Sequence, residues 1–106
     1  MKLGRWVGAD VEIVVAADSA VFTSSGCITG YMKRPILDSR GHFISDAAMQ
    51  SMIGPPPAPP LPHAIVSGRV NGDVLTFTAT YDNGMVLGPL TATLNADRPP
   101  FFPCPP

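Results

Sequence analysis

Two histidines are the first candidates for chemistry in this chain, because imidazole and carboxylate groups are common metal ligands. His42 and His63 lie on opposite sides of a proline-rich segment, with Asp38 and Asp46 as candidate carboxylate partners. The two histidines do not show the i, i+4 spacing that places two ligands on one face of a helix. We therefore expect no metal site, and we interpret both histidines as residues of strand or loop edges.

Hydrolysis would need a nucleophile, a base and a group that orients the base. The candidate nucleophiles lack the Gly-x-Ser-x-Gly pattern of a nucleophile elbow; they are Ser24, Ser25, Ser39 and Ser45. Asp10 and Glu12 are two residues apart and would share one face of a strand, where paired acids can transfer protons but solvated carboxylates are commoner. No glycine-rich phosphate loop precedes a helix. The sequence thus indicates a protein that is not an enzyme and takes no cofactor, with a hydrolase as the least favoured alternative.

The two cysteines, Cys27 and Cys104, lie far apart and lack the spacing of a Cys-x-x-Cys motif. Such a pair is more typical of a structural disulfide than of free thiols or a redox switch, which remain the alternatives. No secretory signal is present at the start of the sequence. The pair favours a periplasmic or secreted protein whose leader has been removed, and the alternative is a cytoplasmic protein.

Composition limits the architecture and the partners. The 106 residues suit a single domain, 1–106, and 45% apolar against 14% charged residues excludes a disordered chain. With 13 prolines and 10 glycines, long helices are not expected. The net charge of −1 and the scattered basic residues exclude a nucleic-acid surface. No apolar run approaches the roughly 20 residues of a transmembrane helix.

Short extended segments separated by turns predict an all-β domain. Residues 74–81 alternate strictly, so Leu75, Phe77, Ala79 and Tyr81 share one face. A closed antiparallel up-and-down barrel of about eight strands is favoured over a sandwich, because consecutive hairpins need no crossover and closure removes exposed edges. The expected strands are 3–7, 11–17, 20–25, 26–32, a segment starting near Ile36 and Leu37, 42–44, 63–70, 74–81 and 85–94.

Three segments depart from the strand pattern. Residues 46–53 are the one candidate helix, with a loop as the alternative. Residues 54–62 read GPPPAPPLP and predict an extended polyproline loop that acts as a connector or lid, with peptide recognition as the alternative. Gly88 and Pro89 predict a bulge, and a tail carrying Phe101 and Phe102 could cover an open end if Cys104 is bonded to Cys27.

Several motifs in order resemble a known group. The opening Gly4-x-Trp6-x-Gly8 is similar to the Gly-x-Trp signature of lipocalin-like proteins. The chain further resembles small, uncharacterised bacterial proteins of unknown function in its Cys27–Gly30 strand, its Asp38-x-x-Gly41-x-Phe43 turn, its Gly68-x-Val70-x-Gly72-Asp73 strand pair, its Leu87–Leu90 segment and its late Cys104. It departs from the group at Val7, where a glycine is frequent. The resemblance implies a secreted or periplasmic barrel with a structural disulfide, and no known activity.

The expected interior is the remaining candidate site. Its apolar lining includes Leu75, Leu90 and Leu94, together with the proposed ligand-binding residues Trp6, Phe22, Phe43, Phe77 and Tyr81. Eight strands leave either a filled core, which we favour, or one small cavity. The sequence therefore predicts a non-enzymatic binding module that holds a small apolar ligand or a protein partner at the barrel mouth. The alternative is an accessory subunit that docks onto a larger assembly through its Pro-rich apolar loops.

Overall fold

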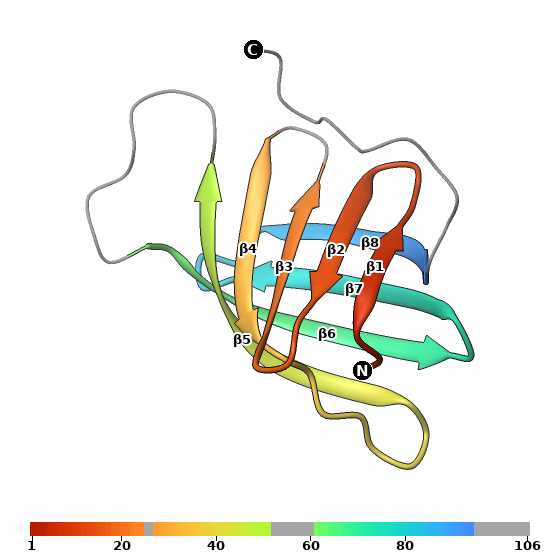
Figure 1. Ribbon diagram of the computed structural model, residues 1–106. Coiled ribbons are helices and arrows are strands. Elements are labelled where there is room, and N and C mark those ends of the chain that lie inside the picture. The colour runs from red at the N-terminus through yellow and green to blue at the C-terminus, as the bar shows by residue number, and fades with distance from the viewer. Residues whose placement is uncertain (25–26, 52–60, 95–106) are drawn as a thin grey trace.

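The chain folds into a closed antiparallel β-barrel in the computed structural model, which describes residues 1–24, 27–51 and 61–94 (Figure 1). Each strand pairs with the next, and β8 returns to β1. This confirms the prediction of an all-β, up-and-down barrel of eight strands, and none of the described residues is helical. The strands are β1 Gly4–Val7, β2 Val11–Val15, β3 Ser19–Ser24, β4 Ile28–Lys33, β5 His42–Ser51, β6 His63–Asn71, β7 Val74–Tyr81 and β8 Val86–Leu94.

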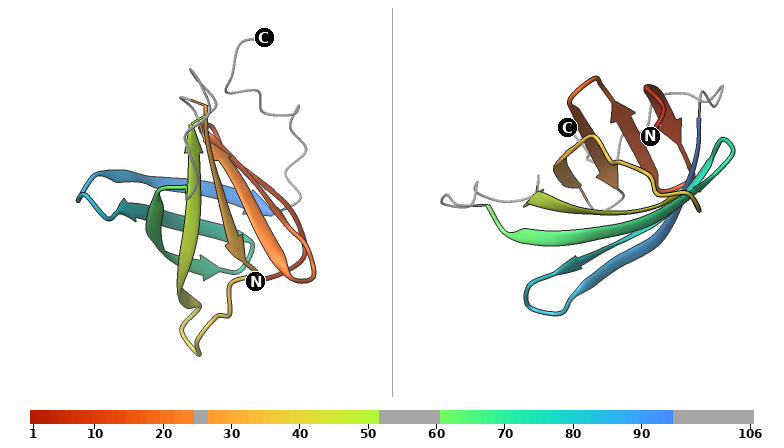
Figure 2. Two further views of the ribbon diagram at one scale, coloured as in Figure 1. Left: turned by 90° about the vertical axis from the view of Figure 1, so that its left-hand side faces the viewer. Right: turned by 90° about the horizontal axis from the view of Figure 1, so that it is seen from below.

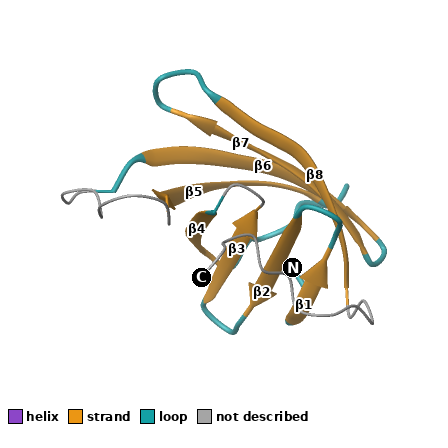
Figure 3. Ribbon diagram, turned by 90° about the horizontal axis from the view of Figure 1, so that it is seen from above, coloured by secondary structure: helices purple, strands orange, loops and turns teal. Residues whose placement is uncertain are grey.

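The barrel consists of two curved walls. β1–β4 form one wall and β5–β8 the other, and the strands of the two walls run in clearly different directions (Figures 2 and 3). β5 joins the walls on one side, because it pairs with β4 over Ala47–Ser51 and with β6 over His42–Ala48. On the other side, the described residues of β1 and β8 pair at Trp6 with Leu94 and at Val7 with Thr93.

Close packing of main chain against main chain characterises this seam between β1 and β8. A Cβ atom added to Gly8 would lie 1.8 Å from the carbonyl oxygen of Thr91. No side chain fits in that space, so the glycine after β1 allows β8 to come close enough to close the barrel.

The interior is filled by side chains from both walls. The largest fully buried ones include Trp6, Phe22 and Phe77, and the rings of Phe22 and Phe77 pack edge to face with centroids 5.2 Å apart. Gly30 lies against the Phe22 ring, where an added Cβ would come within 2.1 Å of it. Small residues opposite large rings therefore let the aromatic side chains fill the barrel, in agreement with the expected filled core.

Residues 46–51 continue β5, so the predictions of a helix or a loop at 46–53 are wrong over these six residues. Ala47 and Met49 point inward while Ala48 and Gln50 are less buried, which is the two-residue period of a strand. Pairing with both β4 and β6 outweighs the helix tolerance of Ala, Met and Gln. The remaining residues, 52 and 53, lie outside the described part.

The glycines expected at turns and at the bulge lie where the sequence predicts, but one expected strand is absent. Gly41, Gly72 and Gly84 all have positive φ angles at the predicted turns. The bulge expected at Gly88 and Pro89 is present as a register shift between Phe77 and Ala79 on the facing strand. The expected strand near Ile36 and Leu37 is wrong, because residues 34–41 form a loop between β4 and β5.

Four predicted features lie wholly or mainly outside the described residues. They are the polyproline loop, of which only Leu61 and Pro62 are described, the Phe101–Phe102 tail, Ser25 and Cys104.

Candidate functional site

The residues expected to bind a ligand lie mainly in the packed core. Trp6, Phe22, Phe43 and Phe77 are all buried, and an apolar ligand among them would have to separate rings that already contact one another. Tyr81 is only partly buried, and its burial raises the pKa of its hydroxyl. It lines a small surface hollow of about 190 Å³ together with Pro62, His63, Asp82 and Asn83.

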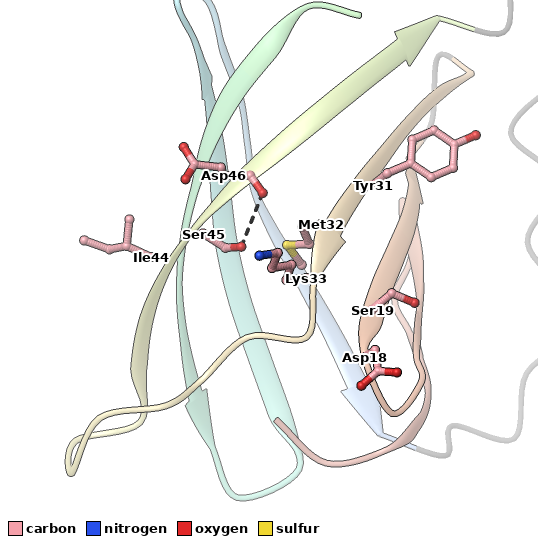
Figure 4. A pocket seen from close by; sticks show the side chains of 8 residues that line it. All are labelled: Asp18, Ser19, Tyr31, Met32, Lys33, Ile44, Ser45 and Asp46. Carbon is pink, nitrogen blue, oxygen red and sulfur yellow. Dashed lines mark hydrogen bonds between the residues drawn. The ribbon is translucent and has the colours of Figure 1, made fainter.

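A larger groove lies on the outer side of the barrel, where β4 and β5 diverge (Figure 4). The two strands pair only as far as Met32 and Ala47, and beyond that point the 34–41 loop separates them. The groove has a volume of about 540 Å³. Its lining residues are Asp18, Ser19, Tyr31, Met32, Lys33, Ile44, Ser45 and Asp46.

Strand alternation determines which side chains reach this groove. Tyr31 and Lys33 are exposed on β4, and Ile44 and Asp46 are exposed on β5. Met32 is buried between them and contributes to the base of the groove. The groove therefore combines an apolar base with a rim that carries charges of both signs.

A second hollow, of about 620 Å³, lies along β5 next to the 34–41 loop. Ile36 is 89% exposed and Ile44 is 77% exposed, and both line it. Ile44 lines the β4–β5 groove as well. The sequence contains a signal for this hollow. Phe43 and Ile44 are apolar neighbours in a strand, and neighbouring side chains point to opposite faces, so one of the two has to face outward.

His63 bridges two carboxylates on the outer surface. Its Nδ1 lies 2.7 Å from Asp82 Oδ1 and its Nε2 lies 2.7 Å from Asp46 Oδ1. The hydrogen bond to Asp82, followed by that to Asp46, raises the pKa of His63 above its ordinary value of 6.5. The imidazole ring thus connects β5 and β6 to the turn after β7, and it holds Asp46 at the rim of the groove.

The two histidines that were weighed as metal ligands have different carboxylate neighbours in the structure. Asp38 accepts hydrogen bonds from the backbone N–H groups of Arg40 and His42, at 2.8 and 2.9 Å. The N–H of His42, then that of Arg40, lowers the pKa of the Asp38 carboxyl. His42 is therefore associated with Asp38, and His63 with Asp46. Among residues 1–24, 27–51 and 61–94, no group of three or more His, Cys, Asp or Glu could hold a metal ion.

The acids and serines considered for hydrolysis are dispersed. Asp10 lies in the turn before β2, whereas Glu12 lies within β2 and forms an ion pair with Arg5 at 3.3 Å. Ser24 is buried, and its hydroxyl donates to the Ile28 carbonyl at 3.5 Å. Ser45 lines the β4–β5 groove, and Ser39 lies in the 34–41 loop.

Cys27 is almost fully buried immediately before β4, with a φ of 63°. Its expected partner, Cys104, is outside the described residues, so the disulfide stays a prediction. Within the described ranges, no helix is long and apolar enough to cross a membrane.

Comparison with known proteins adds nothing to this geometry, because no family model, curated protein or solved structure matches the chain.

Proposed function

We propose that this barrel is a non-enzymatic binding module that holds a segment of a partner protein in the β4–β5 groove. The observation that carries the proposal is the exposure of Ile44 between two hollows on the outer surface. Exposed apolar side chains beside a groove are typical of interaction sites. Burying one aliphatic side chain of this size contributes roughly 1.5–3 kcal/mol.

The packed interior favours a protein partner over a small apolar ligand. A ligand inside the barrel would have to displace Phe22 or Phe77, which pack against each other at its centre. The outer groove needs no such rearrangement. The accessory-subunit alternative depends on the Pro-rich segment, whose residues lie mainly outside those described.

Selection of short linear peptides from a displayed random library tests the proposal. Enriched peptides should bind the unmodified chain and lose binding to an Ile44→Lys variant. Val14→Lys is the matched control, because Val14 is an exposed apolar strand residue that lines neither hollow. Enriched peptides that bind Ile44→Lys normally would contradict the proposal. An apolar small molecule that alters Trp6 fluorescence, with no peptide enriched, would support the interior site instead.

We also propose that the chain is a lipocalin-like barrel of the periplasm or the exterior, stabilised by a Cys27–Cys104 disulfide. The burial of Cys27 beside β4 supports a structural role for its sulfur. Intact mass spectrometry of the non-reduced protein should show a mass lower by two hydrogen atoms than that of the reduced protein. Alkylation of two thiols without prior reduction would contradict the disulfide.

A further inference from the structure

We infer that His63 controls access to the β4–β5 groove through its proton. The charged imidazole holds the Asp46 carboxylate beside β6, and loss of the proton transfers that carboxylate to the Lys33 ammonium on the β4 side of the groove. The inference rests on the proposed function only in treating the groove as a binding site. Its argument comes from the hydrogen-bonding capacity of the ring, from the register of the strands and from the buried methionine at the base of the groove.

The His63 ring lies between two carboxylates. Its Nδ1 is 2.7 Å from Asp82 Oδ1, and its Nε2 is 2.7 Å from Asp46 Oδ1. Carboxylate oxygens only accept hydrogen bonds, whereas a neutral imidazole has one N–H donor and one acceptor nitrogen. The charged ring can therefore donate to both acids, and loss of its proton leaves one of the two carboxylates facing a lone pair.

The main chain favours the release of Asp46 over that of Asp82. The Asp82 N–H donates to the His63 carbonyl at 3.2 Å, so these two residues stay adjacent whatever the charge of the ring. Met49 donates to the Pro62 carbonyl, so the odd-numbered residues of β5 bond toward β6 and Asp46 directs its peptide groups toward β4. We therefore expect the neutral ring to keep its N–H on Nδ1, toward Asp82, and to release Asp46.

Lys33 is the cation that the register brings next to the released carboxylate. The β4–β5 pairing at Met32 and Ala47 places the next residues, Lys33 and Asp46, opposite each other. Both side chains are exposed and line the groove, and the Asp46 carboxylate extends away from the Lys33 ammonium (Figure 4). Within the part of the chain that the structure describes, Lys33 forms no ion pair. Opposite side chains on one sheet face have Cβ atoms about 4.5–5.5 Å apart, so rotation of the Asp46 side chain can join the two charges.

A further acid, Asp18, lines the same groove from the turn before β3. It does not occupy the place of Asp46, because the residue opposite Lys33 on the β3 side is Ser19. Asp46 is therefore the acid whose strand position directs it to either cation, His63 on β6 or Lys33 on β4.

Two further cations lie on the β4 side and are already engaged. Arg34 donates from Nε to the Met1 carbonyl at 2.9 Å, and the Met1 ammonium donates to the Pro35 carbonyl at 2.9 Å. The Arg34 N–H also donates to the Asp18 carbonyl. These bonds direct both groups toward the β1–β4 wall, which leaves Lys33 as the cation available to Asp46.

Two tyrosines are the other titratable groups near the ring. Tyr81 on β7 lines the same small hollow as His63, and burial raises the pKa of its hydroxyl. Tyr31 on β4 donates its hydroxyl to Gln50 at 3.2 Å. Phenols ordinarily ionise near pH 10, well above imidazole, so neither group competes for the proton of His63.

The transfer changes access to the base of the groove. Met32 is 7% exposed and lies at that base. An ion pair between Lys33 and Asp46 would lie over the Met32 side chain, whereas the bond from Asp46 to His63 leaves it uncovered. The bond to Asp82, and then that to Asp46, raises the pKa of His63 above 6.5, so the groove should narrow as the pH rises beyond that value.

Nuclear magnetic resonance of the isotopically labelled full chain tests the transfer from about pH 5 to about pH 9, the range in which histidines titrate. The ¹⁵N shifts of the His63 ring report which nitrogen keeps the proton, and we expect Nδ1–H in the neutral ring. The ¹³Cγ signal of Asp46 should move at the same pH. A neutral ring with its proton on Nε2, or an Asp46 signal that ignores the His63 titration, would overturn the inference.

A soluble nitroxide radical added to the same samples measures access to the groove. Its relaxation of the Met32 ε-methyl signal should fall roughly two-fold as the pH rises through the transition, because an exposed ion pair is formed only part of the time. The Met49 methyl is the internal control, since it is 1% exposed and lines none of the three hollows. Unchanged relaxation of Met32 would show that the groove does not narrow.

Lys33→Gln identifies the cation that receives Asp46. This variant should keep the titration of the His63 ring and lose the pH dependence of Met32 relaxation. Lys2→Gln is the matched control, because Lys2 is an exposed lysine paired with Asp73 and lines none of the three hollows. A pH dependence that persists in Lys33→Gln would contradict the transfer to Lys33.

Peptides from the library selection connect the transfer to the proposed function. They should bind the unmodified chain roughly two- to five-fold more weakly above the transition than below it, as expected for competition with an exposed ion pair. Equal affinity at both pH values would overturn the control of binding by His63. If no peptide binds at either pH, the proposed function fails, and the ring and Met32 measurements still decide the transfer.

Discussion

His63 shows how a single residue can connect three parts of the outer surface. Ala48 of β5 lies directly opposite His63 of β6, so Asp46 is its diagonal neighbour, and Asp82 approaches the other ring nitrogen from the turn after β7. Neither hydrogen bond is apparent from the sequence, because the partners lie 17 and 19 residues away. The arrangement makes the surface at this position sensitive to pH.

Stability should therefore depend on pH through His63. The folded-state pKa of His63 is raised above 6.5, so the folded protein binds the proton more tightly than the unfolded chain. The stabilising contribution is complete below the unfolded-state pKa, and it is lost as the pH rises through the folded-state value. Urea denaturation midpoints measured across this range should fall with rising pH in the unmodified chain, and His63→Gln should remove that part of the dependence.

His42→Gln provides the control for this titration. His42 bonds to Asp38 through its backbone N–H, which the substitution keeps. The pH dependence of the His42→Gln variant should resemble that of the unmodified chain. If His63→Gln shows the same dependence as well, the bridge does not contribute to stability.

At the scale of strands, the sequence predicted most elements because alternation and turn chemistry agree there. Residues 74–81 alternate strictly, and the glycines at 41, 72 and 84 occupy the positions that need positive φ angles. The 46–51 segment was not recognised as a strand, because Ala, Met and Gln fit a helix equally well and only pairing with two neighbours selects the strand.

The groove could not be predicted, because it depends on where pairing stops. The sequence contains Ile44 and Asp46, but it does not show that Arg34 is bonded toward Asp18 and Met1. Those contacts join distant parts of the chain and end the β4–β5 ladder at Met32. A site of this kind follows from tertiary register rather than from a local motif.

The close approach of main chain to main chain at the β1–β8 seam makes Gly8 a sensitive position. Gly8→Ala should destabilise the barrel, because the added methyl group would overlap the Thr91 carbonyl. The expected loss in the free energy of unfolding is about 1–3 kcal/mol, the usual cost of overpacking. The free energy of unfolding in urea measures this effect. Gly72→Asn is the control, since nothing lies within 4 Å of that position and Asn tolerates its left-handed conformation. Equal stability of the Gly8→Ala variant would contradict the observed seam.

For the molecule as a whole, the filled interior and the open outer groove have different consequences. Aromatic rings from both walls meet at the centre of the barrel. These buried side chains therefore contribute to stability rather than to recognition. The exposed residues of β5 are available to a partner, because they contribute little to the core. Substitutions in the two regions should therefore separate folding from binding.

Phe77→Ala tests the role of the interior. Removal of this buried ring should cost about 3–5 kcal/mol in the free energy of unfolding and leave an apolar cavity. Benzene should then stabilise the variant, measured as a rise in its melting temperature, and should have no such effect on the unmodified chain. A comparable rise in the unmodified chain would show that its interior already accepts a ligand.

Amide hydrogen exchange of β5, residue by residue, tests most directly where the pairing of β4 and β5 ends. Ser45 and Ala47 direct their N–H groups toward β6, so their amides should exchange slowly. The Ile44 and Asp46 amides face the groove, and we expect them to exchange far faster, at rates close to those of exposed loops. Equal protection of all four amides would show that the pairing of β4 with β5 continues past Met32 and Ala47, and it would contradict the open groove between the two strands.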